Sequence, residues 1–206
     1  MAKHIKAEIL GRITKRWGNP SLGEACTSVR KIYEIECPKG NGSRNWNGYL
    51  LEALILKLLQ TKISADCIFT NCRLALIEDT KYDILLCATS KDGKSQSPIC
   101  LSIKTSLRER YKQAEIEGVI AKNVYKRCFT ALLTMNSKEL KSRKTDLHGI
   151  DMAVDCTNAV QLEELIKKIL SLNPTPRSLI RTLGPLIVEP KIKTCKSHKA
   201  NLQRKA

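Results

Sequence analysis

A strand pair in the middle of the chain brings an acid and a lysine together. The apolar run Ile-Leu-Leu-Cys-Ala follows Asp83, and a second run, Ile-Cys-Leu-Ser-Ile, precedes Lys104. If the turn between them is centred between Gly93 and Lys94, Asp83 faces Lys104 across an antiparallel hairpin. An acid beside a lysine at a sheet end suits a site for a metal and an activated water. Pairing alone, however, favours a surface ion pair worth under ~1 kcal/mol.

A second acid lies on the helix face that we expect to be buried. Arg110, Ala114, Glu117, Ala121 and Val124 recur at spacings of four and three residues. This spacing places Glu117 on the apolar stripe that faces the sheet. A carboxylate on such a face needs a cation, a hydrogen-bond donor or a metal as its partner. The acid and lysine of the hairpin supply that environment, and the three residues together favour a Mg²⁺ site beside a lysine.

These residues resemble, in a permuted form, the motif of the PD-(D/E)XK nucleases. Asp83 is followed by Ser102-Ile103-Lys104, and Ser102 holds the place where the usual motif has its second acid. Glu117 stands thirteen residues after Lys104. In restriction endonucleases similar to EcoRII and NgoMIV, a Glu on the next helix, at about this spacing, replaces the lost acid. The resemblance covers about residues 50–135.

The same group of enzymes carries an Arg-(Asp/Glu)-Arg element between the lysine and the Glu, which recognises C·G pairs. This chain has Arg108-Glu109-Arg110 there, so the resemblance implies contacts with adjacent G·C pairs. The chemistry agrees, because a guanidinium bonds guanine O6 and N7 and a carboxylate accepts from cytosine N4. Lys112 and Gln113 are then expected beside phosphates or bases. The simpler alternative is a solvated helix N-terminus.

The resemblance also implies a role for each acid and for the lysine. Asp83 and Glu117 would hold Mg²⁺, and Lys104 would orient or deprotonate the attacking water and stabilise charge on the phosphate. Glu52 resembles the helix Glu that many nucleases of this fold use as an outer ligand. The alternative for Glu52 is a helix residue that faces solvent.

Strand-like and helix-like segments alternate along the chain, which predicts the α/β class. Helices are expected over residues 1–17, 46–62, 107–127 and 159–172, and strands over 67–77, 82–89, 98–104, 128–134 and 151–155. We expect a mixed sheet with helices on both faces, and the resemblance implies a restriction-endonuclease-like fold. Residues 1–190 are expected to form one domain. Residues 191–206 carry six basic residues and no acid, and we expect a mobile tail that either touches DNA phosphates or only aids solubility.

The composition limits the class of partner. The 206 residues carry a net charge of +16, which favours a polyanionic partner, most often nucleic acid. No apolar run reaches the ~20 residues that span a bilayer, and the N-terminus is charged where a secretory signal is apolar. We therefore expect a cytoplasmic protein without a membrane partner. Nine cysteines without CxxC spacing indicate neither a zinc site nor disulfides, and four in apolar stretches are expected to be buried thiols: Cys87, Cys100, Cys128 and Cys156.

The resemblance implies a type II restriction endonuclease that uses Mg²⁺ to hydrolyse duplex DNA at a palindromic site with a CC/GG core, and the net charge agrees with such a substrate. The chain carries one catalytic motif and no internal repeat, so a symmetric homodimer is expected to cut the two strands of the palindrome. Two alternatives stay open. One is a repair or junction-resolving nuclease of the same fold, and the other is a non-enzymatic basic nucleic-acid-binding protein whose acids are structural.

Overall fold

The computed structural model has a five-stranded sheet at its centre, with the strands in the order of the sequence. It describes residues 43–176, apart from residues 75, 78, 79, 91, 92, 94, 109, 144 and 145, together with residues 11, 15 and 35. The helix predicted over residues 1–17, except for residues 11 and 15, and the basic tail over 191–206 lie outside the described residues. The predicted domain limits therefore stay a prediction.

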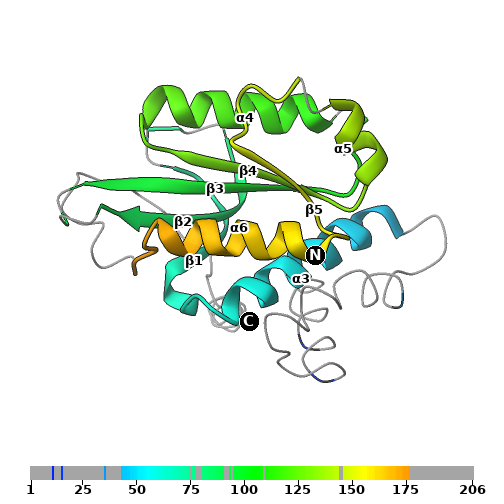
Figure 1. Ribbon diagram of the computed structural model, residues 1–206, viewed down its shortest axis with the longest axis horizontal. Helices are drawn as coiled ribbons and strands as arrows, with labels where there is room; N and C mark the ends of the chain where they lie inside the picture. The colour runs from blue at the N-terminus through cyan, green and yellow to red at the C-terminus, as the bar shows by residue number, and fades with distance from the viewer. Residues whose placement is uncertain are drawn as a thin grey trace, which may run out of the picture.

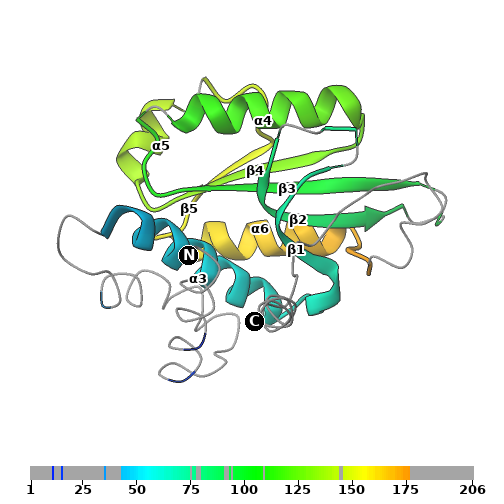
Figure 2. The same ribbon diagram turned by 180° about the vertical axis from the view of Figure 1, so that it is seen from behind.

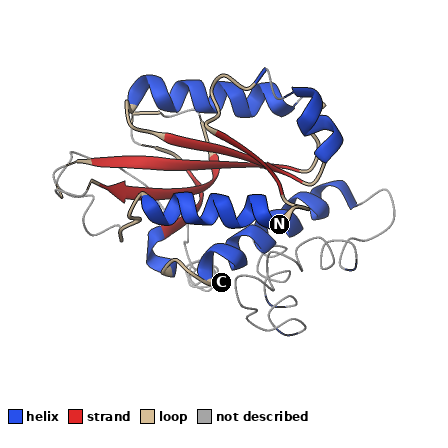
Figure 3. Ribbon diagram, viewed as in Figure 1, coloured by secondary structure: helices blue, strands red, loops and turns tan. Residues whose placement is uncertain are grey.

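The sheet is mixed, as the sequence predicts (Figures 1 and 3). The first three strands pair antiparallel as successive hairpins, because short connections join them. The last three strands run parallel, and helical crossovers connect them. The strands are β1 (Ile68–Cys72), β2 (Tyr82–Thr89), β3 (Gln96–Lys104), β4 (Phe129–Thr134) and β5 (Met152–Asp155).

Helices cover both faces of the sheet, which confirms the predicted layering (Figures 1 and 2). On one face lie α3 (Ser43–Gln60) and α6 (Ala159–Ser171), and on the other lie α4 (Arg110–Val124) and the short α5 (Ser137–Arg143). A 3-10 turn (η1, Ala65–Cys67) precedes β1. Helix α5 has no counterpart among the predicted elements, since two turns between strands give little periodic signal. In the described part of the chain no helix has the length and apolar character needed to cross a membrane.

Several predicted boundaries differ from the structure, and the end of the first strand and the start of the helix after the hairpin matter most for the site. The first strand ends at Cys72 instead of continuing to Ile77. The backbone takes a left-handed conformation at Leu76 (φ 64°), beyond the end of this strand, and this conformation is incompatible with an extended strand as far as Ile77. The helix that follows the hairpin begins at Arg110 and not at Leu107, so residues 105–108 form a separate segment between β3 and α4.

Successive side chains of β3 point alternately into two hydrophobic cores on opposite faces of the sheet. Leu101 and Ile103 belong to the larger core, which α3 and α6 cover. Cys100 belongs instead to a cluster that contains Ala121 of α4. Ser102 and Lys104 follow Cys100 at intervals of two residues, so their side chains lie on the α4 side of the sheet. The polar end of β3 is therefore presented to α4.

The hairpin between β2 and β3 differs from its predicted register by two residues. Thr89 lies opposite Gln96, and the last pair of the ladder is Ile84 with Leu101. The turn is closed by a hydrogen bond from the Ser90 N–H to the Ser95 carbonyl, and Gly93 occupies a left-handed conformation (φ 69°) that suits glycine. The turn is thus centred one residue earlier than expected. The faces of the strands are unchanged, because a shift of two residues preserves their parity.

The described cysteines are all reduced and buried. This confirms the prediction for Cys87, Cys100, Cys128 and Cys156. The Cys100 and Cys128 sulfurs lie 3.7 Å apart between β3 and the start of β4. Burial raises the pKa of the Cys87 thiol to about 11, which keeps this side chain a neutral packing group.

Helix α4 touches the loop before β5 through main-chain atoms. A Cβ built at Gly118 would lie 2.2 Å from the carbonyl oxygen of Gly149. A Cβ at Gly149 would in turn lie 2.3 Å from the carbonyl oxygen of Glu115. No side chain fits between the two backbones, so this glycine pair sets how closely the loop packs against α4.

We expect Gly118→Ala to lower the free energy of unfolding by roughly 2–3 kcal/mol, because the helix and the loop must separate to admit the methyl group. Urea denaturation followed by circular dichroism measures the change. Gly48→Ala in α3 is the matched control, since a Cβ there meets no atom within 4 Å. This control should be neutral or stabilising by up to about 1 kcal/mol. Equal stabilities of the two variants would contradict the close contact.

Candidate active site

Asp83 lies where β2 and β3 diverge. β2 continues to pair with β1 as far as Tyr82 and Cys72, whereas its ladder with β3 ends at Ile84. The Asp83 carboxylate takes the place of the missing ladder bond, because its Oδ2 accepts a hydrogen bond from the Ile103 N–H at 2.7 Å. The side chain is about one-fifth exposed. The acid is thus fixed to the neighbouring strand and still open to solvent.

Lys104 is the last residue of β3, and its side chain is only 7% exposed. Its Nζ lies 3.1 Å from Asp83 Oδ2 and 4.0 Å from Glu117 Oε2. A buried ammonium group needs such counter-charges to offset its lost hydration. Although Asp83 does not lie directly opposite Lys104 as predicted, the lysine side chain reaches it as a diagonal neighbour across the two strands. The predicted contact between the two residues is therefore present.

Glu117 projects from α4 toward the sheet, as its helical spacing predicts. Ser102 Oγ donates a hydrogen bond to Glu117 Oε2 at 2.7 Å, and Gln113 Nε2 donates to Oε1 at 2.8 Å. The Tyr82 hydroxyl donates to the Glu117 main-chain carbonyl at 3.0 Å, which ties α4 to β2 beside Asp83. Burial raises the pKa of the Glu117 carboxyl, although Lys104 and the Ser102 hydrogen bond oppose this effect.

The contact between Ser102 and Glu117 is the most specific feature of the site. Ser102 stands two residues before the lysine, on the same face of β3. The Glu117 carboxylate reaches this serine from another element and lies against its hydroxyl. A carboxylate from α4 therefore lies next to the position from which an acid on β3 would project.

The residues predicted to contact DNA differ in their surroundings. Arg108 and Arg110 are exposed near the start of α4, with the Arg108 side chain 87% exposed. Lys112 is exposed and lines a surface hollow of about 300 Å³. Gln113, by contrast, is bound to Glu117 through its side chain, so its amide supports the acid. Glu109 lies outside the described residues.

Glu52 lies apart from the helix that carries the second acid. It is a half-buried residue of α3, and α3 covers the face of the sheet opposite α4 (Figure 1). The role of Glu52 as an outer ligand stays a prediction.

The donor set suits Mg²⁺. Asp83 accepts both of its bonds at Oδ2, so Oδ1 has no hydrogen-bond partner within the described residues. One or two carboxylates, completed by waters and phosphate oxygens, are a usual protein contribution to a Mg²⁺ site. Among the described residues no cluster of three or more His, Cys, Asp or Glu side chains could hold a metal, and a two-carboxylate site needs no such cluster.

Sequence reasoning missed the two neutral partners of Glu117. Gln113 precedes it by four residues on α4, and this spacing alone identifies a side chain that can reach it. The sequence identifies Ser102 only as the residue at the place of the usual second acid. Its hydrogen bond could not be predicted, because the depth of α4 over the sheet depends on the packing of distant segments.

Comparisons with protein-family models, with curated proteins and with solved structures found no match to this chain.

Proposed function

We propose that this protein is a Mg²⁺-dependent endonuclease of the PD-(D/E)XK type with a displaced catalytic acid. One observation carries the proposal: the Glu117 carboxylate lies against Ser102 and beside the Lys104 ammonium, which also contacts Asp83. An acid from each of two elements and a lysine thus meet at one end of the sheet. The same cluster is what the resemblance requires if Glu117 replaces the missing acid on β3.

The residues have distinct chemical tasks in this proposal. Asp83 and Glu117 hold Mg²⁺, which when bound supplies positive charge against the charge that develops on the scissile phosphate. Lys104 orients the attacking water and stabilises the phosphate charge through its ammonium group. Ser102 and Gln113 donate to the two oxygens of Glu117 and hold the carboxylate in one orientation.

The substrate in this proposal is duplex DNA with a palindromic CC/GG core. The net charge of +16 favours a polyanion. Arg108 and Arg110 stand exposed just beyond the end of β3, so they can reach base edges while the cluster acts on a nearby phosphate. These features support a type II restriction endonuclease more than a nuclease that recognises only DNA shape.

We also propose a symmetric homodimer as the active form. Each chain offers a single Asp83–Lys104–Glu117 cluster, which hydrolyses one phosphodiester bond at a time. A two-fold dimer would present the same arginines to both halves of a palindrome. Light scattering of the complex with DNA in Ca²⁺ measures the number of chains per duplex, and one chain per duplex would argue against the dimer.

The test of the proposed function is incubation of the full chain with plasmid DNA in Mg²⁺ or in EDTA, followed by sequencing of the fragment ends. Discrete, Mg²⁺-dependent fragments with CC/GG at their ends are expected. Unspecific smearing or cleavage confined to branched DNA would instead indicate a repair or junction-resolving nuclease. Retarded but uncut DNA would indicate a binding protein without nuclease activity.

Arg108→Ala and Arg110→Ala are each expected to cost roughly 1–3 kcal/mol of discrimination at a G·C pair, because a guanidinium bonded to guanine carries that much selectivity. Competition binding between duplexes that differ at one base pair measures the loss. Arg127→Ala is the control, since Arg127 is an exposed arginine beyond the far end of α4. A loss that is uniform over all duplexes would make the two arginines phosphate contacts.

A further inference from the structure

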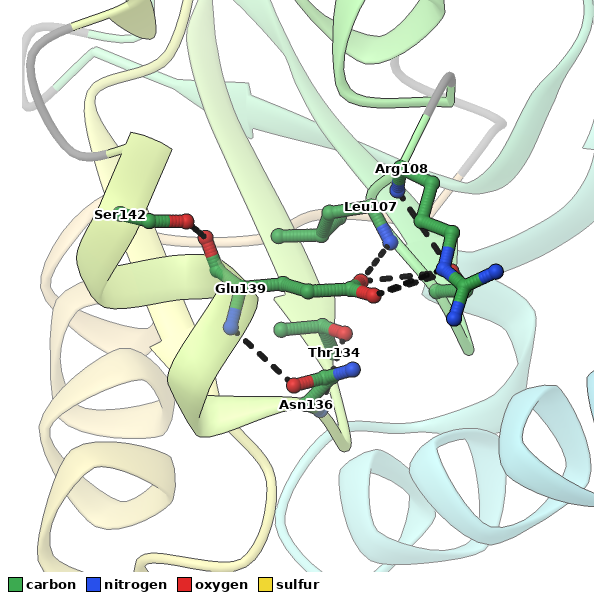
Figure 4. A network of polar contacts seen from close by, with 7 residues as sticks. Leu107, Arg108, Thr134, Asn136, Glu139 and Ser142 are labelled. Atoms are coloured by element: carbon green, nitrogen blue, oxygen red, sulfur yellow. Dashed lines mark hydrogen bonds and ion pairs between the residues drawn. The ribbon is translucent and has the colours of Figure 1, made fainter.

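Glu139 of α5 reaches across to the segment that joins β3 to α4 (Figure 4). Its carboxylate accepts hydrogen bonds from the Leu107 N–H and from Ser106 Oγ, the latter at 3.2 Å from Oε2. Its Oε1 lies 3.7 Å from Arg108 Nε. One side chain therefore binds three consecutive residues that begin two positions after Lys104.

Glu139 is available for these contacts because another residue accepts the main-chain N–H that an acid at its position usually binds. Asn136 caps α5, accepting the Glu139 N–H at its side-chain oxygen (3.1 Å). In a capping box the acid at this position would bond back to the N–H of the cap residue. Here Thr134 Oγ1 accepts the Asn136 N–H instead. The Glu139 carboxylate is left to bind the distant segment.

Leu107, the middle residue of this segment, is held by contacts of its side chain as well as of its main chain. The Leu107 side chain is fully buried and packs in a cluster with Tyr111, Leu132 and Leu140. Its main-chain N–H is held by Glu139, so both the side chain and the backbone of Leu107 are fixed. Arg108 follows directly and therefore starts from a fixed main-chain position.

The Arg108 guanidinium forms an ion pair with Glu139. The contact joins Arg108 Nε, and not a terminal nitrogen, to Glu139 Oε1 (Figure 4). An arginine whose side chain is 87% exposed would otherwise sample many rotamers and lose that freedom on binding. Two terminal N–H groups presented side by side match the O6 and N7 acceptors of guanine.

We propose that Glu139 is a positioning residue that holds Arg108 ready to recognise a G·C pair. This inference rests on the proposed function, because it assigns to Arg108 the task of base recognition. It adds Glu139, from the helix that follows α4 in the chain, to the residues that determine specificity. Glu139 does not itself touch the DNA in this proposal.

The test is selection of duplexes with a randomised central segment by the full chain in Ca²⁺, which permits binding without rapid cleavage. The selected duplexes are sequenced to obtain the base preference at each position. The variants are Glu139→Gln, Arg108→Ala and the two combined. Glutamine keeps an oxygen that can accept the Leu107 N–H, but it lacks the charge that holds Arg108. Glu164→Gln is the matched control, since Glu164 is an exposed glutamate of α6 on the opposite face of the sheet.

Glu139→Gln is expected to reduce the preference on the order of tenfold at the position that Arg108→Ala also affects, with the other positions and the melting temperature near wild type. The combined variant should lose no more than Arg108→Ala alone, because the two residues act through one contact. Full preference in Glu139→Gln would overturn the inference and leave the proposed function intact. Equal losses at all positions would also overturn it, since they indicate a general structural role. Selection of no sequence by the wild type would overturn both proposals.

Discussion

Lys104→Ala is expected to reduce plasmid cleavage by at least about a hundredfold while binding in Ca²⁺ stays close to wild type. The reason is that the ammonium group acts on the attacking water and on the phosphate charge, and removing one such group typically costs ~10²–10³ in rate. The fold should survive, since Asp83 keeps its bond to Ile103 and Glu117 keeps its bond to Ser102. Single-turnover cleavage at saturating enzyme measures the chemical step apart from binding.

Lys122→Ala is the matched control for this change. Lys122 also belongs to a lysine–aspartate pair, with Nζ 2.6 Å from Asp151 Oδ1, but it lies on α4 away from the cluster. Its loss should leave the cleavage rate within about twofold of wild type, because surface pairs of this kind contribute little. Cleavage by Lys104→Ala within about tenfold of wild type would refute the assignment of the lysine.

Glu117→Gln is expected to reduce the rate of cleavage by a factor similar to that of Lys104→Ala. It is also expected to make the protein more stable at neutral pH. The amide can still accept from Ser102, but it cannot supply the negative charge that Mg²⁺ binding requires. Ser102→Ala should reduce cleavage far less, because the serine only orients the carboxylate. A damaging Ser102→Ala together with a mild Glu117→Gln would show that the acid has not moved to α4.

The gain in stability follows from the raised pKa of the Glu117 carboxyl. Between the unfolded and the folded pKa the folded protein binds more protons, so the wild type loses stability as the pH rises through that interval. The amide of the Glu117→Gln variant has no proton to lose and escapes this penalty. Chemical denaturation of the two proteins as a function of pH should therefore give a difference that grows from acidic to neutral pH. A constant difference would contradict the pKa shift.

Much of the fold and of the candidate site could be predicted because it depends on local periodicity. The alternation of β3 gives the face of Lys104, and the helical spacing of α4 gives the face of Glu117. The mixed sheet with helices on both faces follows from the order of strands and helices. The predicted faces of the strands are correct although the predicted hairpin register is wrong by two residues, because a shift of two residues keeps each side chain on the same face.

The parts that could not be predicted depend on contacts between distant segments. The turn at Gly93 selects one register from several with the same parity. Glu139 and Leu107 are separated by thirty-two residues, and the pattern Asn136-x-x-Glu139 alone indicates only the start of a helix. Its real partner depends on how α5 lies against the segment after β3. The identity of the substrate likewise depends on surfaces that periodicity does not describe.

The main-chain contact of Gly118 with Gly149 has a consequence for how freely this chain can vary. Glu117 precedes Gly118 directly, so the height of its main chain above the sheet is set by a backbone contact, while Ser102 and Gln113 orient its carboxylate. Apolar residues beneath α4 can then exchange for others of similar volume without displacing the acid. As long as both glycines remain, substitutions of apolar core residues do not shift the Glu117 carboxylate.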